Sequence, residues 1–227
     1  MSQYTLPIVS RLRIEKLIRL LEDEDEAVFL QGIQLLSALK MVDLSGHALP
    51  PRIFPELRLD AADLTAVRAR QATFAGCSFR RAMMDGASLC EARFHRCDLR
   101  QASMRRADLR GADLGGCRLE DADLSRADLE DARLRGAFLA RADLSGARLI
   151  HTTLSGADLS ETTLYRADLS GANLQGASLR GAVLYRANLR GADLTDTDLS
   201  GARLHGADLT DAVRSGVRTS ADTVWPT

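Results

Sequence analysis

Several features that define common classes of protein are missing from this sequence. It has no apolar run long enough to cross a bilayer, so no transmembrane helix is expected. Its first residues lack a basic segment followed by an apolar one and a cleavage site, so we expect no secretory signal and a cytoplasmic protein. Only Lys16 and Lys40 among its 30 cationic residues are lysines, and the net charge is −1. That is not the basic balance of a protein that binds nucleic acid directly.

The motifs of enzyme active sites are missing as well. The sequence has neither a GxSxG nucleophile elbow nor a GxxxxGK(S/T) phosphate-binding loop. None of its four cysteines forms a CxxC pair, and the four histidines have no paired spacing: His47, His95, His151 and His205. We therefore expect no enzyme activity, no metal and no cofactor.

What the sequence does contain is a period of five residues. From Leu64 to Leu209 every fifth residue is large and apolar, apart from Ala69, and the residue two positions before it is small, usually Ala. Five steps along an α-helix overshoot a full turn by about 140°, so these residues would not form a stripe. On a flat strand, consecutive members would face opposite sides. The period is satisfied by a short extended piece followed by a corner, with both the small residue and the Leu pointing inward.

A second spacing indicates that four such units make one coil. Cys77, Cys97 and Cys117 recur once in every four units, and all occupy the small inward position. Coils of this kind stack into a solenoid. Equivalent inward atoms would then lie in a line about 5 Å apart, which is a poor metal tetrahedron. We therefore expect three stacked, buried thiols, whereas Cys90 falls at a corner, where exposure is expected.

The repeat units resemble those of the pentapeptide-repeat family. The clearest are ADLRG (107–111), ADLSR (122–126), ANLQG (172–176) and ADLTD (207–211). The resemblance implies a right-handed, four-sided (quadrilateral) β-helix, and so a mainly β fold. Stacked at roughly 4.8 Å, the predicted coils would form a rod on the order of 35 Å long.

The remaining segments are expected to cover the ends of the rod, which expose apolar core and unpaired strand edges. Two apolar stripes separated by the acidic run 22–26 indicate a helical hairpin. This hairpin either caps the first coil or serves as a docking or dimer element. The tail contains Trp225-Pro226, which the resemblance implies folds back over the last coil; the alternative is a homodimer contact through this end. The predicted segments are a helical hairpin cap (1–43), a transition with room for an irregular first coil (44–61), the repeat β-helix (62–212) and a C-terminal capping tail (213–227).

Because Leu and Ala fill the interior, only the outer walls remain for recognition. Bulky apolar residues replace polar ones at a few outward positions, and by register Tyr165, Val183 and Tyr185 share one face. An aromatic–arginine patch is typical of a protein-binding surface, although scattered exposed apolar residues are also ordinary. The candidate partner-binding residues are Tyr165, Arg166, Val183, Tyr185, Arg186 and Phe138. An acidic end is formed by Asp193, Asp196, Asp198, Asp208 and Asp211.

Charge is distributed unevenly along the repeat. Residues 62–120 hold 11 arginines and seven acids, whereas residues 141–213 hold seven arginines and nine acids. A rod that runs from mildly basic to mildly acidic can orient a partner electrostatically.

Two functions are compatible with these features. The first is a non-enzymatic protein-binding scaffold; the resemblance implies a DNA-mimicking binder of a type II topoisomerase, DNA gyrase, that protects it from inhibitors. The alternative is an adaptor in which the rod is a spacer and the N-terminal hairpin docks a partner. Neither requires a membrane or direct contact with nucleic acid.

Overall fold

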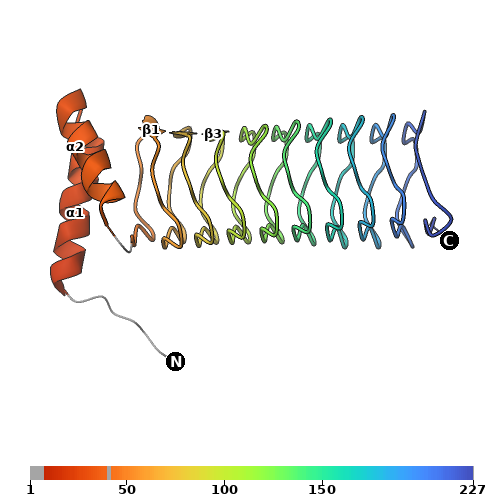
Figure 1. Ribbon diagram of the computed structural model, residues 1–227, viewed down its shortest axis with the longest axis horizontal. Coiled ribbons are helices and arrows are strands. Elements are labelled where there is room, and N and C mark those ends of the chain that lie inside the picture. Colours follow the sequence, from red (N-terminus) through yellow and green to blue (C-terminus); the bar gives the residue numbers. More distant parts are fainter. Residues whose placement is uncertain (1–7, 40–41, 227) are drawn as a thin grey trace.

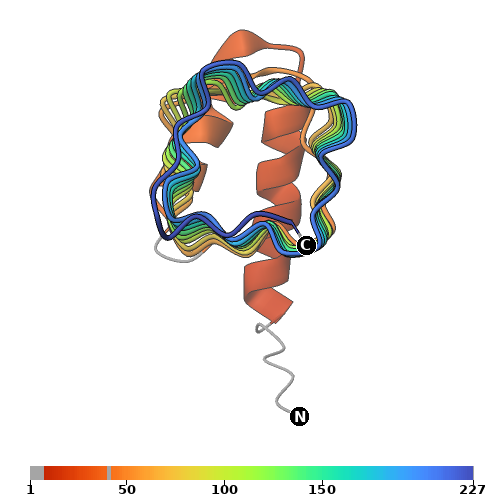
Figure 2. The same ribbon diagram turned by 90° about the vertical axis from the view of Figure 1, so that its right-hand side faces the viewer.

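The computed structural model describes residues 8–39 and 42–226. Two helices, α1 (Ile8–Glu22) and α2 (Glu26–Ser37), lie together at the N-terminal end of a rod of stacked coils (Figure 1). Seen along its axis, the rod has a square outline, and both helices lie across one open end (Figure 2). The described part of the chain is therefore a four-sided solenoid with a helical hairpin at one end.

Neighbouring coils pair in parallel, each residue with the residue four units further along the chain. The continuous strands among the described residues are β1 (Ile53–Pro55), β2 (Thr73–Ala75) and β3 (Arg93–His95), which form one parallel sheet. Elsewhere the coils pair through isolated parallel bridges, such as Arg133 with Thr153. Strand pairing is thus short on each side of the square and interrupted at every corner.

The backbone hydrogen bonds follow the same register. The N–H of Leu134 donates to the carbonyl of Thr153 at 2.7 Å, and the N–H of Thr153 donates back to the carbonyl of Ala132 at 3.0 Å. This pattern repeats along the rod, so each coil is hydrogen-bonded to the coils on both sides. The predicted coil of four five-residue units is confirmed.

The interior is packed with the predicted apolar residues. Every inward Leu or Met from position 99 to position 204 is at most 1% exposed. The missing large side chain at Ala69 is compensated by aromatic neighbours: the ring of Phe74 lies 5.2 Å from those of both Phe79 and Phe94. The cavity left at this level, about 10 Å³, is lined only by apolar residues and offers no polar partner to a water molecule. The core of the solenoid is therefore dry and closed.

The corners use a left-handed backbone conformation. The last residue of each unit has a positive φ, for example 64° at Gly146 and 67° at Gly206. Glycine adopts this conformation without a steric penalty, which explains its frequency at corners. Other residues occupy the same conformation, including Arg166 (54°) and Arg186 (57°).

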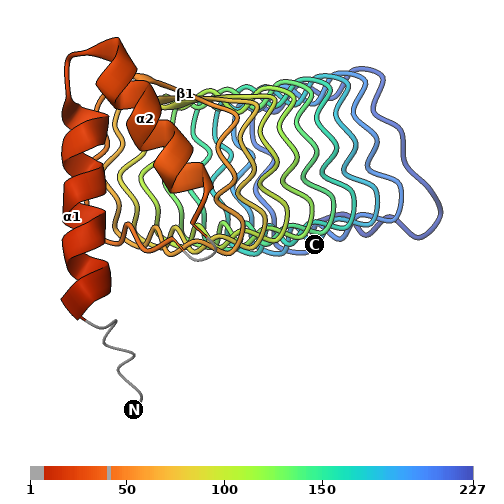
Figure 3. The same ribbon diagram turned by 60° about the vertical axis from the view of Figure 1, so that its left-hand side comes forward.

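The N-terminal hairpin lies beside the first coil (Figure 3). Apolar and ionic contacts attach it there. Asp25 caps α2, because its carboxylate accepts hydrogen bonds from the N–H groups of the following turn. The ring of Phe29 packs 5.6 Å from that of Phe54 in the first coil. Arg52 lies over Phe29, 3.9 Å from the ring centroid, and forms an ion pair with Glu26 at 2.5 Å. The hairpin thereby covers the apolar end of the rod.

Coiling extends beyond residues 62–212 at both ends. Within residues 44–61 the register is regular, since Ala48 pairs with Arg68 and β1 pairs with β2. At the other end Arg203 pairs with Val224, one position out of the register of the other coils. The row from position 43 to position 224 contains nine successive bridges. At about 4.8 Å each these span about 43 Å, longer than the predicted rod.

The inward positions can be tested by one truncation. We expect Leu134→Ala to lower the free energy of unfolding by about 2–5 kcal/mol, because it removes a fully buried side chain from a core that cannot collapse around the loss. The control Arg135→Ala, at an exposed position, should change it by less than about 0.5 kcal/mol. Urea unfolding measures both, and equal effects would contradict an inward Leu134.

Candidate partner-binding face

The recurrent aspartates before the inward Leu stabilise turns. The carboxylate of Asp143 accepts a hydrogen bond from the N–H of Ser145 at 2.8 Å, and that of Asp168 accepts one from Ser170 at 3.0 Å. Such local bonds satisfy backbone donors at the corner. Within residues 8–39 and 42–226, no group of three or more His, Cys, Asp or Glu residues is placed to hold a metal ion.

The three stacked cysteines are buried, as predicted. Their thiols donate to backbone carbonyls: Cys77 to Phe54 at 3.1 Å and Cys117 to Phe94 at 2.7 Å. Burial raises the pKa of the Cys117 thiol to about 12. The Cys117 thiol therefore remains protonated, and all three side chains serve as small core residues.

The expectation that Cys90 is exposed was wrong. Only 8% of this residue is accessible. The guanidinium of Arg70, one coil earlier, lies 3.7 Å from its sulfur and covers the position. A long side chain from the adjacent coil therefore shields the thiol.

Equivalent side chains of successive coils form rows along the rod, and each side of the square carries such rows. One side of the square runs from residues 43–46 through 63–66 and 83–86 to 203–206. We call its part from residue 103 onward the arginine face, defined by residues 103–106, 123–126, 143–146, 163–166, 183–186 and 203–206. It holds six arginines and two acids. The next side along the chain is the acidic face, defined by residues 108–111, 128–131, 148–151, 168–171, 188–191 and 208–211. It holds three arginines and seven acids. From residue 103 onward, the overall charge of −1 therefore conceals two adjacent faces of opposite charge.

Most of the candidate partner-binding residues come together on the arginine face. Tyr165 and Tyr185 are stacked one coil apart and are 40% and 37% exposed. The guanidinium of Arg166 lies 5.2 Å from the centroid of the Tyr165 ring. Val183 is on the same face, beside Tyr185, and Arg186 follows at the corner. We call Tyr165, Val183 and Tyr185, with Arg166 and Arg186, the tyrosine patch.

Phe138 does not belong to this patch. It lies on a different side of the rod, paired with Arg118 and Asp158, and is 49% exposed. Two residues that sequence analysis left out lie next to the tyrosine patch: Arg203, which follows Val183 in its row, and His205, whose ring centroid lies 6.3 Å from that of Tyr185. The sequence could have indicated both, because they follow Val183 and Tyr185 by 20 residues, which is one coil.

The acidic end is spread over three sides rather than gathered in one patch. Asp193 and Asp196 lie on one side, Asp198 on the next, and Asp208 and Asp211 on the acidic face. Asp198 contacts Arg180 at 3.2 Å, and Asp208 contacts Arg190 at 3.3 Å. Part of this negative charge is therefore neutralised within the rod.

Ion pairs neutralise many of the arginines on the other sides. Arg100 pairs with Asp98 at 2.5 Å, and its hydrogen bonds hold the pKa of the Asp98 carboxyl below the ordinary value. Further pairs on these sides join Arg110 to Asp108, Arg118 to Glu120, Arg141 to Asp121 and Arg148 to Asp128. On the arginine face Arg105 is paired, with Asp85. In the part of the chain that the structure describes, no ion pair involves the other five arginines of this face: Arg106, Arg126, Arg166, Arg186 and Arg203.

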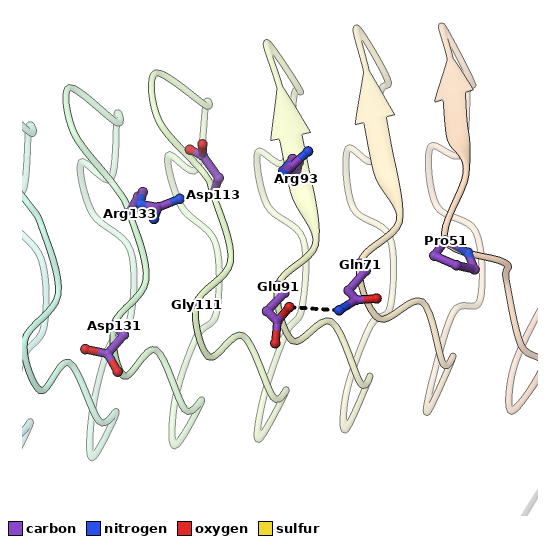
Figure 4. A pocket seen from close by; sticks show the side chains of 8 residues that line it. All are labelled: Pro51, Gln71, Glu91, Arg93, Gly111, Asp113, Asp131 and Arg133. Carbon is purple, nitrogen blue, oxygen red and sulfur yellow. Dashed lines mark hydrogen bonds between the residues drawn. The ribbon is translucent and has the colours of Figure 1, made fainter.

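Two shallow grooves run along corners of the rod. One, of about 530 Å³, is lined by residues of both charges: along one row Asp113 stands between Arg93 and Arg133, and Gln71 bonds Glu91 at 2.9 Å (Figure 4). The other, of about 650 Å³, lies on the arginine face and is lined by Asp85, Gly86, Arg105, Arg106, Ser125, Arg126 and Ser145. Asp85, the acid that lines this second groove, is paired with Arg105. The other two arginines of the groove, Arg106 and Arg126, form no ion pair among the described residues.

No helix among the described residues has the length and apolar character needed to cross a bilayer.

Comparisons with known proteins agree with this architecture. The model of the pentapeptide repeats matches in eight copies, in overlapping stretches between residues 58 and 216. The chain is similar to HetL of Nostoc sp. strain PCC 7120, a pentapeptide repeat protein involved in heterocyst differentiation regulation. The two are 30% identical, over 86% of this chain and 95% of that chain, with a TM-score of 0.53. It is also similar to a trypsin-treated form of QnrB1, a plasmid-mediated fluoroquinolone resistance protein. Here the identity is 21%, over 80% of this chain and 91% of that chain, with a TM-score of 0.51. No curated protein sequence matches the chain.

The burial of the thiols can be measured by labelling. We expect none of the four cysteines to react rapidly with a thiol reagent in the folded protein, because each is at most 8% exposed, and all four to react in denaturant. The Arg70→Ala variant should make Cys90 alone reactive. Rapid labelling of Cys77, Cys97 or Cys117 in the folded wild type would contradict the stacked core positions.

Proposed function

Because this chain belongs to the pentapeptide-repeat family, we propose that it is a non-enzymatic protein-binding scaffold whose arginine face docks a partner protein. The observation that carries the proposal is the tyrosine patch. It combines exposed aromatic rings with arginines that no ion pair of the described residues neutralises. Tyr and Arg are the residue types that most often dominate binding energy at protein interfaces.

The rod suits this role because its surface is preorganised. The backbone of each coil is hydrogen-bonded to both neighbours, and the core beneath the patch is fully buried. The side chains therefore stand at fixed spacing before a partner arrives. A surface that is already ordered loses less conformational entropy on binding.

A more specific candidate is binding to a type II topoisomerase such as DNA gyrase. The feature in its favour is the acidic face, whose seven acids and three arginines supply the negative charge that a DNA-like rod requires. The likeness to QnrB1, at 21% identity, concerns the fold alone. A supercoiling assay with and without a fluoroquinolone separates this candidate from other partners; unchanged supercoiling and drug-induced cleavage would remove it.

The adaptor function is favoured by one feature of the hairpin. Leu30 and Leu35 of α2 are 42% and 49% exposed, although other residues of the same helix pack on the rod. If the protein is such an adaptor, partner binding depends on Leu30 and Leu35 and not on the tyrosine patch.

The scaffold proposal is tested by replacing both tyrosines. We expect the double variant Tyr165→Ser/Tyr185→Ser to capture its partner at least about tenfold less well, since each ring is an exposed anchor. Its melting temperature should stay near that of the wild type. The measurement is quantitative capture from a lysate of the source cells on the immobilised full chain. The control is Phe138→Ser, which removes a somewhat more exposed aromatic from another side. Undiminished capture by the double variant would contradict the proposal.

A further inference from the structure

One corner row of the arginine face repeats the order Arg-Arg-Gly. Positions 106, 126 and 146 are Arg, Arg and Gly, and so are positions 166, 186 and 206. The residues are stacked on successive coils, because the N–H of each corner residue from Arg106 to Arg186 donates to a carbonyl of the next coil, as from Arg106 to Ser125 at 3.1 Å. We call positions 106 and 126 the first arginine pair and positions 166 and 186 the second.

The second member of each pair extends over the glycine that follows it. The Cγ atom of Arg126 lies 3.6 Å from the position that a Cβ on Gly146 would take, and that of Arg186 lies 3.4 Å from the corresponding position on Gly206. Corner side chains in this row therefore lean toward the next coil. Arg106 precedes Arg126, and Arg166 precedes Arg186, so like charges follow one another at a spacing of about 4.8 Å.

The stability of the rod does not account for this row. Like charges on adjacent rungs of a sheet are destabilising. At another corner row, stacked neighbours are complementary: Asp121 binds Arg141 at 2.8 Å, and Arg81 donates to Gln101 at 2.8 Å. Each arginine pair lacks such a neighbour in the described part of the chain, so its charge is available to a ligand.

The acids of the same face do not neutralise the pairs. Asp143 accepts a hydrogen bond from the N–H of Ser145, and Asp123 accepts one from Ser125 at 2.9 Å. Asp123 also lies 3.9 Å from Arg105, whose main partner is Asp85. These carboxylates are engaged on the flat part of the face, whereas the arginine pairs occupy its corner.

We propose that the arginine face binds an acidic segment of the partner protein, with the segment running parallel to the rod axis. This inference rests on the proposed scaffold function. Carboxylates of this segment meet the two arginine pairs, and an apolar side chain packs beside the second pair, on Val183 and the tyrosine rings. Arginine binds carboxylates through directed, paired hydrogen bonds.

The spacing of the two pairs fits an extended chain. Their centres lie three coils apart, which is about 14 Å. In an extended peptide, side chains four residues apart point the same way and lie about 13 Å apart. A segment with two acidic clusters four residues apart therefore reaches both pairs at once.

The charge of the remaining surface favours a peptide over a nucleic acid. The chain has a net charge of −1, and the side adjoining the arginine face is the acidic face. A nucleic acid brings one charge per nucleotide over its whole length and is usually met by a broadly basic protein. A short acidic segment needs only the narrow basic strip that the corner row provides.

The test uses the full-length protein and a fluorescein-labelled peptide of eight residues: two Glu, two Ser, two Glu, then Phe and Ser. We expect fluorescence anisotropy to show binding at low salt that weakens as salt rises. The same peptide with Gln in place of Glu should bind at least about tenfold more weakly. Replacing both arginine pairs (Arg106→Gln, Arg126→Gln, Arg166→Gln and Arg186→Gln together) should weaken binding by a similar factor without lowering the melting temperature, because it removes repulsion.

The matched control removes the same charge from other sides: Arg118→Gln, Arg141→Gln, Arg148→Gln and Arg180→Gln together. It should change peptide affinity by no more than about threefold, as expected for screened, distant charges. Equal loss in both variants would show a non-specific charge effect and overturn the inference. So would a large fall in melting temperature of the first variant, which would make the row structural.

Two further outcomes separate this inference from its alternatives. If a single-stranded oligothymidylate binds more tightly than the peptide and loses affinity in the same variant, the ligand chemistry is phosphate and the acidic-segment inference fails. A second outcome is that the fourfold arginine variant binds the peptide as tightly as the wild type, while the Tyr165→Ser/Tyr185→Ser variant still captures less of its partner. That result would contradict this inference but not the scaffold proposal.

Discussion

The parallel backbone ladder between successive coils is the constraint on which the rest of this molecule depends. It fixes which residues point inward, because a backbone paired on both sides must alternate its side chains. It also converts sequence spacing into position: equivalent residues of successive coils stand in one row, and equivalent residues of successive units stand on adjacent sides. The inward rows are filled by Leu and Ala and leave a dry interior. All recognition by the rod is thereby confined to four narrow, rigid walls.

Much of the fold follows from the sequence because every five-residue unit has the same inward, outward and corner positions. The period of five residues excludes a helix and a flat strand, and the spacing of Cys77, Cys97 and Cys117 indicates the size of the coil. Cys90 was misjudged because the local position says nothing of the long Arg70 side chain one coil away. The rod is longer than predicted because backbone pairing tolerates prolines at 50 and 51 and an unmatched Arg214, neither of which keeps the side-chain pattern.

The positions of the candidate residues on the rod follow from the register of 20 residues. It assigns Tyr165, Val183 and Tyr185 to one face and Phe138 to another. The charge pattern was the larger omission. Counted along the chain, charge forms a weak gradient; counted by side from residue 103 onward, it divides into an arginine face and an acidic face. Which arginines are neutralised depends on rotamers and distances between coils, and the structure is needed to show that Arg105 is paired while Arg106 is in no ion pair of the described residues.

The register itself can be measured most directly by solution NMR. Nuclear Overhauser contacts between backbone groups should connect equivalent residues of successive coils at every rung from position 43 to position 203, for example Arg133 with Thr153. Backbone chemical shifts should be helical only within α1 and α2. Contacts at another separation, or helical shifts in the middle of the chain, would contradict the four-sided coil and the assignment of every surface row described above.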